Sequence, residues 1–589
     1  MNKRLAFSFL VLGFVSIVAQ VVIQRELING FYGNEFFIGV VLASWFIWTA
    51  AGSGIKGLSF PRKRESLEDT GSPIKALGDD KRNASGKHLP PLFIAIGFVF
   101  LAEIFLIRLL NIYVGLPGET PNLICGVLIA LAAPAPICLM LGMWWTQGTR
   151  TLCGQTPSAE TEGGAAAAVN RAYLIELAGF IVGGILFSFV LVRLQEFMVA
   201  GILILLSLGS AILFTLKLRF SLRAVAAFLL VVVACLMFSH YPGAIDRFTT
   251  AFRYRGQEVT ESRNSRYGNI AVTKIGTQSN FYENGVLFGS TEKVEFIEDL
   301  IHLSLLEHPS PGRVLLIGGG FTGAINEILK HPVEEVDYLE IDPELIRIAR
   351  RHIPPEFEKA LSDPRVKIIN ADGRYFLKNE KGAFDAIIVN LPAPSTALID
   401  RFYTKDFYEA VKGRLNPGGI LAACLPFSSS APGRNMEDLN ASIFKTLKEV
   451  FGRVIVLPED IDFFLASTDQ ELTYDPKVLV ERFEERGIEA SFVHPAYIKY
   501  RLTTDRIEKA LSSFGKNTTA RVNEDFLPVA YFYQNLAWLD QFHPGYSGFF
   551  KIVASHFLAI FAGIAALLAI FLMATRRDLT SVAPILSIA

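Results

Sequence analysis

Seven apolar runs in the first 240 residues decide what this chain can fold into. They occupy residues 5–22, 36–53, 92–112, 123–145, 172–192, 197–216 and 222–239. Each run is long enough to cross the ~30 Å hydrocarbon core of a bilayer as a helix. A hydrophobic content of 51% over 589 residues is also too high for an ordinary soluble protein. We therefore predict a seven-helix transmembrane region at 1–242, with a long loop at 56–90.

An eighth apolar run, residues 552–574, follows a stretch of globular composition and is closed by Arg576 and Arg577. It predicts a C-terminal transmembrane helix at 550–575. Residues 582–589 look like the start of a further apolar segment, so we expect the chain to continue beyond residue 589. The first run lacks a small-residue cleavage site and is followed at once by more spans, which indicates an anchor rather than a signal peptide.

The distribution of basic residues predicts the topology in the plasma (inner) membrane. The loop at 56–88 carries eight Lys and Arg side chains among acids and turn formers, whereas the alternate loops hold only Arg25 and Arg193. Basic loops stay in the cytoplasm, so the N-terminus and the loop at 56–90, which we expect to be disordered, are predicted to be cytoplasmic. Seven crossings then place the following domain outside the cell. A re-entrant run around Pro134 and Pro136 would reverse that side.

Ionisable side chains lie within two of the apolar runs. Glu103 and Arg108 belong to the third run and Glu176 to the fifth. Charge at membrane depth is costly, so such groups either mark a functional site or form structural ion pairs and snorkel to an interface. Both interpretations remain open. Of the five cysteines only Cys424 lies in the globular part, and no Cys/His cluster has metal-ligand spacing, so we predict no metal site.

The globular part begins near residue 254. Residues 266–289 alternate short apolar segments with Gly and Asn-Gly, which is typical of β hairpins, and we predict a small β domain at 253–296. Residues 297–545 alternate apolar strands, from VLLIG to ILAACLP, with helices. This alternation predicts a doubly wound parallel sheet of the Rossmann type. The expected fold class is thus an α-helical polytopic membrane region joined to an α/β Rossmann-like domain.

A glycine-rich turn follows the strand VLLIG and precedes a predicted helix. Its glycines are Gly318, Gly319, Gly320 and Gly323, in the pattern G-x-G-x-x-G. Glu340 ends the next strand, where a carboxylate can accept hydrogen bonds from ribose hydroxyls, and Asp372 ends the third, where it can accept from an adenine amino group. Together they predict a nucleoside pocket for a dinucleotide or an S-adenosyl sulfonium compound. The alternative is a tight turn with two helix-capping acids.

The order and spacing of several segments resemble the spermidine/spermine synthase family over residues 266–538. These segments are YGNIAVTKIGTQSNFYENGVLFGSTEKVEF, RVLLIGGGFTGAINEILKHP, VDYLEIDPELIRIAR, DPRVKIINADGRYFL, FDAIIVNLPAPSTALIDRFYTKDFYEAVKGRLNPGGILA and NEDFLPVAYFYQNLAW. The apolar YGNEFFIGVVLASWFIWTAAGSG is similar to the membrane-fused branch of that family. The resemblance implies a small β domain before a class I methyltransferase-like domain. It also implies aminopropyl transfer from decarboxylated S-adenosylmethionine to a polyamine, and makes Gly318, Gly320, Glu340 and Asp372 nucleoside-binding positions.

The positions that the resemblance makes catalytic depart from the family pattern. Asn390 stands where the family has an Asp, and Ala393 where it usually has another acid. Phe288 replaces a Gln, Phe321 replaces an Asp in the glycine turn, and the family's Tyr is missing around 296–302. A polyamine is protonated near neutral pH, so a carboxylate has to hold the cation and accept its proton. Asn390 supplies neither charge nor a base.

Tyr403 and Asp406, just beyond this strand, are the other candidate catalytic residues, although packing for Tyr403 and helix entry for Asp406 explain them equally well. Our leading hypothesis is a membrane-bound, spermidine-synthase-like aminopropyltransferase that binds decarboxylated S-adenosylmethionine or S-adenosylmethionine, with little activity on ordinary polyamines. The alternatives are an S-adenosylmethionine-dependent alkyl- or methyltransferase and a non-catalytic sensor, scaffold or transporter-associated protein. Expected partners are the bilayer, a nucleoside and a polyamine, with a homodimer as a candidate assembly. The net charge of -1 argues against nucleic acid.

Overall fold

The computed structural model describes residues 3–31, 33–55, 88–113, 123–155, 162–215, 220–292, 294–426, 433–469, 471–542 and 544–575. The chain divides into two compact units. The helical unit comprises Met1–Arg255 with Val553–Ala589, and the α/β unit comprises Gly256–Ile552. Residues 56–87 of the predicted cytoplasmic loop and the apolar segment 582–589 lie outside the described residues.

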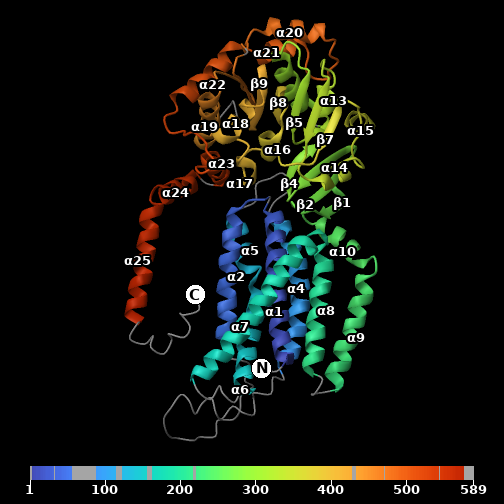
Figure 1. Cartoon of the computed structure of the whole chain (residues 1–589), viewed down its shortest axis with the longest axis vertical. Helices are drawn as coiled ribbons and strands as arrows, with labels where there is room; N and C mark the ends of the chain where they lie inside the picture. Colours follow the sequence, from blue (N-terminus) through green and yellow to red (C-terminus); the bar gives the residue numbers. More distant parts are fainter. Residues whose placement is uncertain are drawn as a thin grey trace. The chain divides into compact units, whose positions relative to one another are not determined.

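The helical unit consists of long apolar helices, coloured blue to green in Figure 1. They are α1 (Lys3–Gly30), α2 (Phe36–Gly54), α4 (Leu89–Leu110), α5 (Leu123–Ala132), α6 (Ala135–Gln155), α7 (Glu162–Phe189), α8 (Glu196–Thr215), α9 (Phe220–Met237), α10 (Tyr241–Thr250) and, after the α/β unit, α25 (Phe557–Thr575). Among the described residues, six helical stretches are long and apolar enough to cross a membrane, and the bent pairs α9 with α10 and α24 with α25 raise this to eight. The stretch with Pro134 and Pro136 counts as one of the six.

A buried ion network joins four helices of this unit. The Arg108 guanidinium of α4 lies 2.8 Å from Glu26 Oε1 of α1, 2.9 Å from Glu196 Oε2 of α8 and 2.8 Å from Asp246 Oδ1 of α10. Arg253 adds a second cation, 3.3 Å from Glu26 Oε2. For Arg108 the structure therefore shows the interhelical ion pairing that the sequence left as one of two interpretations. Buried Glu103 does not join the network.

The α/β unit begins with a four-stranded antiparallel sheet of order β1-β2-β3-β4. Its strands are β1 (Glu258–Asn264), β2 (Asn269–Ile275), β3 (Gln278–Glu283) and β4 (Val286–Ser290). Asn284 and Gly285 connect β3 to β4 with φ values of 50° and 81°. The Asn-Gly pair supplies the left-handed backbone that a two-residue hairpin turn requires, which explains why the sequence signal was informative.

The second sheet has seven strands in the order β10-β11-β9-β8-β5-β6-β7. They are β5 (Arg313–Ile317), β6 (Glu335–Leu339), β7 (Val366–Ile369), β8 (Phe384–Val389), β9 (Leu415–Pro426), β10 (Arg453–Leu457) and β11 (Ile461–Ser467). The five strands from β9 to β7 run parallel, and β11 and β10 extend one edge antiparallel. The predicted fold class is confirmed, with the difference that the sheet is mixed rather than wholly parallel.

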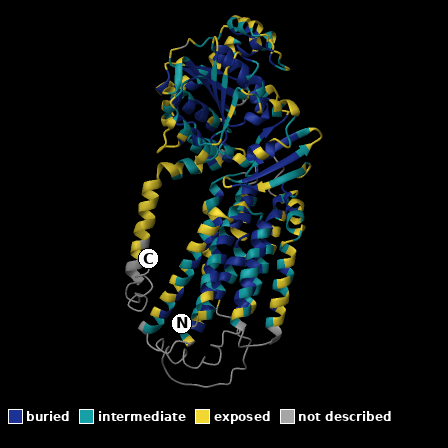
Figure 2. Ribbon diagram, turned by 45° about the vertical axis from the view of Figure 1, so that its right-hand side comes forward, coloured by how far each residue is buried: buried dark blue, intermediate teal, exposed yellow. Residues whose placement is uncertain are grey.

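Helices cover both faces of this sheet, whose strands are largely buried in Figure 2. One face packs against α11 (Val294–Glu298), α12 (Ser304–Glu307), α13 (Ala324–Ile328), α14 (Pro343–Ala349), α15 (Pro355–Leu361), α20 (Pro476–Glu485) and α21 (Pro495–Arg501). The remaining helices are α16 (Gly373–Asn379), α17 (Ala397–Asp400), α18 (Lys405–Lys412), α19 (Arg434–Val450), α22 (Thr504–Lys516), α23 (Val529–Asp540) and α24 (Pro544–Ser555). The carboxyl ends of β5, β6 and β8 meet at one edge, as in other open α/β sheets that bind ligands.

Candidate functional site

The glycine turn between β5 and α13 has an unusual backbone. Gly318, Gly319 and Gly323 adopt φ values of 78°, 62° and 102°, in the left-handed region that side chains rarely enter. A Cβ atom at Gly318 would also lie 2.9 Å from the carbonyl oxygen of Asn390. The glycines are therefore required both by the backbone path and by the close approach of the end of β8.

Glu340 lies beside this turn, at the end of β6, and its side chain is 5% exposed. The Tyr338 hydroxyl donates a hydrogen bond to Oε2 at 3.3 Å, and the Asp342 amide donates to Oε1 at 3.3 Å. Burial raises the pKa of Glu340 to about 8, and the nearby acids Glu283 and Asp342 raise it further. The carboxyl group is thus buried near other acids, and each of its oxygens can accept a further hydrogen bond.

Glu283 is a site residue that the sequence reasoning missed. It ends β3 in the small sheet, and it acts electrostatically on Glu340, which lies in the second sheet. Burial, followed by the charge of Asp342, raises the pKa of Glu283 to about 7. Its position directly before the Asn-Gly turn was the one available signal, because hairpin tips of a small β domain can reach a neighbouring ligand site.

Asp372 is engaged by protein groups. Its Oδ1 atom accepts a hydrogen bond from the Tyr375 amide at 3.0 Å as the N-cap of α16, and its Oδ2 atom forms an ion pair with Arg401. This arrangement favours the helix-capping interpretation that the sequence left open. An adenine amino group would have to share the carboxylate with these two partners.

Asn390 directly follows β8 and lies against the glycine turn. Its amide donates to the Ile317 carbonyl at 2.9 Å, and its side chain occupies the space where a Cβ of Gly319 would stand. Tyr403 is fully buried, and its hydroxyl donates to the carbonyls of Leu391 at 3.2 Å and Pro392 at 3.1 Å. Tyr403 therefore positions the strand end that carries Asn390, and its hydroxyl points into the fold.

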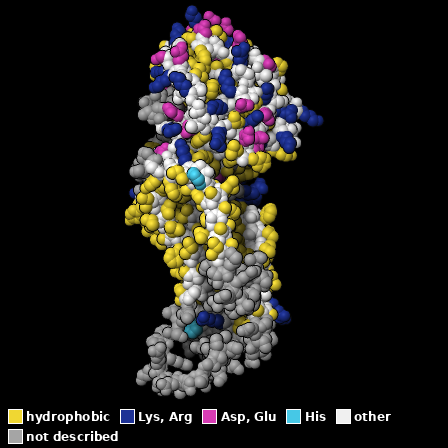
Figure 3. Space-filling model, turned by 90° about the vertical axis from the view of Figure 1, so that its left-hand side faces the viewer, with side chains coloured by type: hydrophobic (Ala, Val, Ile, Leu, Met, Phe, Trp, Pro, Cys, Tyr) yellow, Lys and Arg dark blue, Asp and Glu magenta, His cyan; other side chains and the backbone are white. Residues whose placement is uncertain are grey.

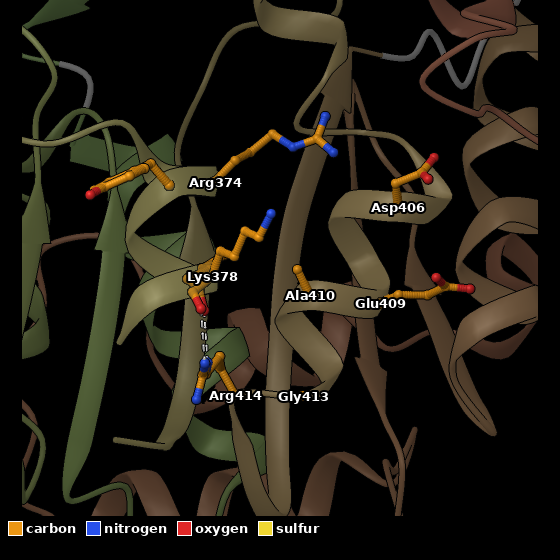
Figure 4. Close-up of a pocket in the computed structure, with 9 residues that line it drawn as sticks. Arg374, Lys378, Asp406, Glu409, Ala410, Gly413 and Arg414 are labelled. Atoms are coloured by element: carbon orange, nitrogen blue, oxygen red, sulfur yellow. Dashed lines mark hydrogen bonds between the residues drawn. The ribbon is translucent and has the colours of Figure 1, made fainter. Parts of the chain in front are cut away.

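Asp406 lies on α18, away from the glycine turn. Its Oδ2 atom accepts from the Asp525 amide at 3.1 Å. It lines a surface pocket of about 620 Å³ between α16 and α18, together with Arg374, Tyr375, Leu377, Lys378, Glu409, Ala410, Gly413 and Arg414 (Figure 4). None of these residues belongs to the turn or to the end of β6, so the structure does not bring Asp406 together with Glu340.

Aromatic rings fill the space between the small sheet and the glycine turn. Phe321 of the turn is fully buried, stacks on Phe288 of β4 at 6.0 Å and meets Phe281 of β3 edge-on at 4.9 Å. These two replacements, Phe288 and Phe321, therefore contact each other. No group of three side chains suited to a metal ion comes together in the described part of the chain.

Several known proteins are similar to this chain. Residues 294–451 match the model of the spermine/spermidine synthase domain. A polyamine aminopropyltransferase of Korarchaeum cryptofilum is 30% identical over 242 residues, which cover 38% of this chain and 73% of that protein. A spermidine synthase of Dictyostelium discoideum is 34% identical over 179 residues, covering 29% and 61%. Among solved structures, a spermidine synthase from Thermotoga maritima is 22% identical with a TM-score of 0.36, covering 43% of this chain and 87% of that one.

Proposed function

We infer that this chain, which belongs to the spermine/spermidine synthase family, binds an adenosyl nucleoside over the glycine turn and holds its ribose with Glu340. The observation that carries this proposal is the carboxyl group of Glu340. It is buried beside a turn of left-handed glycines, and no Lys or Arg of the described residues forms an ion pair with it. A buried carboxyl group without a cation is unfavourable unless hydrogen-bond donors reach it. Tyr338 and Asp342 each donate one hydrogen bond to Glu340, and two adjacent ribose hydroxyls would supply donors for its remaining acceptor positions.

Aminopropyl transfer demands more than nucleoside binding. An amine nitrogen attacks the methylene carbon next to the sulfonium, the C–N bond forms, the C–S bond breaks, and its electron pair leaves with the neutral thioether. The amine must lose a proton to a base on the way. Asn390 cannot take that proton. Glu298, the acid that ends α11 after the small sheet, is another candidate base, but its carboxylate already accepts hydrogen bonds from the amides of Ser491, Phe492 and Val493 at 2.7, 2.7 and 2.8 Å.

We therefore propose a membrane-bound, spermidine-synthase-like protein that retains the nucleoside site and transfers aminopropyl groups to putrescine slowly or not at all. The Phe288–Phe321 contact supports this proposal, because it puts an apolar pair where the family pattern has two polar side chains. The same contact favours the second candidate, a non-catalytic nucleoside sensor. An alkyl- or methyltransferase that uses S-adenosylmethionine is the third, since a nucleophilic acceptor needs no base.

The membrane part of the proposal concerns the helical unit. We propose that α1, α2, α4, α5 with α6, α7, α8 and α9 each cross the inner membrane and that α25 crosses it again. The basic loops then lie in the cytoplasm and the α/β unit outside. An extracytoplasmic site would not meet the cytosolic pool of sulfonium nucleosides, which favours the sensor over the transferase.

Isothermal titration calorimetry of the full chain in nanodiscs tests the nucleoside site. The ligands are S-adenosylmethionine, its decarboxylated form and methylthioadenosine, and we expect measurable binding of at least one of them. Glu340→Ala should weaken that binding by about 1–3 kcal/mol through lost charge-assisted hydrogen bonds. Glu356→Ala, which alters an exposed acid on α15, is the matched control. Absence of heat with all three ligands would remove the nucleoside proposal.

A further inference from the structure

Phe526 is held in solvent by a rigid turn of the α/β unit. Its side chain is 102% exposed, so the whole ring is accessible to solvent. The turn is closed by a β-bridge in which the Leu527 amide donates to the Glu524 carbonyl at 3.0 Å and the Glu524 amide donates back at 3.3 Å. The turn therefore projects an aromatic ring away from the domain.

The base of the turn is fixed by charged and buried side chains. The Arg374 guanidinium donates to both carboxylate oxygens of Asp525, at 2.7 and 2.6 Å, and the Thr404 hydroxyl donates to Asp525 at 2.8 Å. Fully buried Asn523 donates to Asp400 and to the Tyr403 carbonyl, each at 3.1 Å. A bidentate fork of this kind restricts orientation as well as distance. The exposure of Phe526 is thus built into the fold.

Further exposed apolar side chains surround this base. Leu527 is 46% exposed, Leu398 of α17 is 56% exposed and Tyr375 of α16 is 67% exposed. Arg374 donates to Asp525 and also to the Arg401 carbonyl, at 3.2 Å. Tyr375 is next to Arg374 in the chain, Leu398 is three residues before Arg401, and Leu527 is two residues after Asp525. We call these four residues the apolar patch: Tyr375, Leu398, Phe526 and Leu527. Exposed Lys378, labelled in Figure 4, lines the adjoining pocket together with Tyr375.

The position of the patch within the α/β unit indicates what covers it. The chain enters this unit next to β1 and leaves it through α24, which continues into the apolar helix α25. Figure 1 shows β1, α17, α23 and α24 on one side of the α/β unit, the lower side in that view. Both connections of the α/β unit to the apolar helices, before β1 and through α24, thus leave the unit from this one side. Aromatic and aliphatic side chains with a flanking lysine are typical of surfaces that rest in the headgroup region.

We propose that the apolar patch docks on the surface of the bilayer, with the Phe526 ring inserted at the boundary between headgroups and acyl chains. Insertion removes the apolar ring from water, which is favourable. Within the α/β unit the ring stays fully exposed. A second copy of the chain is the competing occupant. The face of the α/β unit that Figure 3 presents carries interspersed Lys, Arg, Asp and Glu side chains.

Site-specific photo-crosslinking of the full chain in native membranes tests the proposal. The photoreactive p-benzoylphenylalanine replaces Phe526 in one variant and Tyr500 in a matched control, because Tyr500 is 46% exposed on α21, on the opposite side of the unit (Figure 1). After irradiation, mass spectrometry of the labelled peptide identifies its adduct. We expect phospholipid adducts at position 526 and at least tenfold fewer at position 500.

Other outcomes contradict the proposal in distinct ways. A dimer of the chain linked through position 526 would identify a second copy as the occupant. Equal lipid labelling at both positions would mean that the ring samples lipid only by collision. No adduct at position 526, in a chain whose thermal unfolding matches that of the unmodified protein, would leave the patch in water.

Discussion

Asn390 is the residue on which the proposed loss of aminopropyl transfer depends. It lies at the end of β8 against the glycine turn, and Ala393 follows in the same loop. We predict that Asn390→Asp together with Ala393→Asp places two carboxylates after β8 and raises putrescine affinity at least tenfold, because carboxylates attract a diammonium ion. Calorimetry with putrescine measures this, and Asn390→Leu with Ala393→Ser is the uncharged control.

Turnover is a separate readout for the same pair of changes. Release of methylthioadenosine from decarboxylated S-adenosylmethionine should be very slow in the unmodified chain. Brisk putrescine-dependent release by that chain would show that another group accepts the proton. That result would contradict the proposed loss of aminopropyl transfer but not the proposed nucleoside binding.

Glu340 makes nucleoside binding depend on pH. Its pKa is raised to about 8 by burial, so the free site is mostly protonated at neutral pH, and the carboxylate that accepts ribose hydrogen bonds forms as the pH rises. Affinity for methylthioadenosine should therefore increase from pH 6.5 to about 8 and then level off, by at most about tenfold per pH unit. Glu340→Gln should bind weakly with no such rise.

Glu283 provides an internal check on this assignment. Its negative charge raises the pKa of Glu340, so Glu283→Gln should move the affinity rise to lower pH. Calorimetric titrations at half-unit intervals of pH would detect the displacement. If the pH midpoint of the affinity rise is unchanged in Glu283→Gln, the two carboxyl groups do not interact electrostatically.

At the scale of elements, a chain of three hydrogen bonds joins the ends of α13 and α20 to the segment Asp299–Leu303. Arg486 Nη1 lies 2.8 Å from His331 Nδ1, His331 Nε2 lies 2.9 Å from His302 Nδ1, and His302 Nε2 lies 3.0 Å from Glu327 Oε2. Because Arg486 can only donate, each histidine accepts at Nδ1 and donates at Nε2, so both are neutral. Burial lowers the pKa of His331 well below its usual range, and the positive charges of Arg486 and Lys330 lower it further.

This chain of hydrogen bonds should make the α/β unit sensitive to acid. A histidine with a depressed pKa takes up its proton only on unfolding, so its stabilising effect is present above about pH 6.5 and is lost as the pH falls, by up to about 1.4 kcal/mol per pH unit. We predict that thermal unfolding of the full chain shifts to lower temperature between pH 7.5 and 5.5, and that His331→Gln reduces the shift. His494→Asn, which keeps an N-cap acceptor on α21, should retain it. A shift of equal size in His331→Gln would assign the acid sensitivity to other groups.

For the molecule as a whole, the proposed number of membrane crossings predicts the side of the membrane on which the α/β unit lies. We predict that a cysteine introduced at Glu258, an exposed position at the start of the α/β unit, reacts with a membrane-impermeant maleimide in intact cells. A cysteine introduced at Ser72, in the basic loop, should react only after lysis. Both measurements are read against a background in which the five native cysteines are replaced by alanine. Labelling at Ser72 but not at Glu258 in intact cells would invert the topology.

Patterns local in the sequence determined the classes of structure in this protein. Apolar runs predicted the helices of the helical unit, because burying a backbone in an apolar medium requires hydrogen bonds within the same segment. The alternation of strands and helices predicted the Rossmann-like sheet, and Asn284–Gly285 predicted a hairpin. The glycine spacing predicted a turn of special backbone, and Gly318, Gly319 and Gly323 have the positive φ values that require glycine.

Contacts between residues far apart in the chain were decided only by the tertiary structure. The antiparallel strand β11 joins the sheet edge by pairing with β9, and β10 then pairs with β11. No local pattern in the sequence predicts these partners. Glu283 reaches Glu340 from another sheet, and Arg401 takes the carboxylate of Asp372. Arg108 finds its acids on three other helices. Charge and packing depend on which side chains the fold brings within a few ångströms, and sequence spacing carries that information only inside a single helix or hairpin.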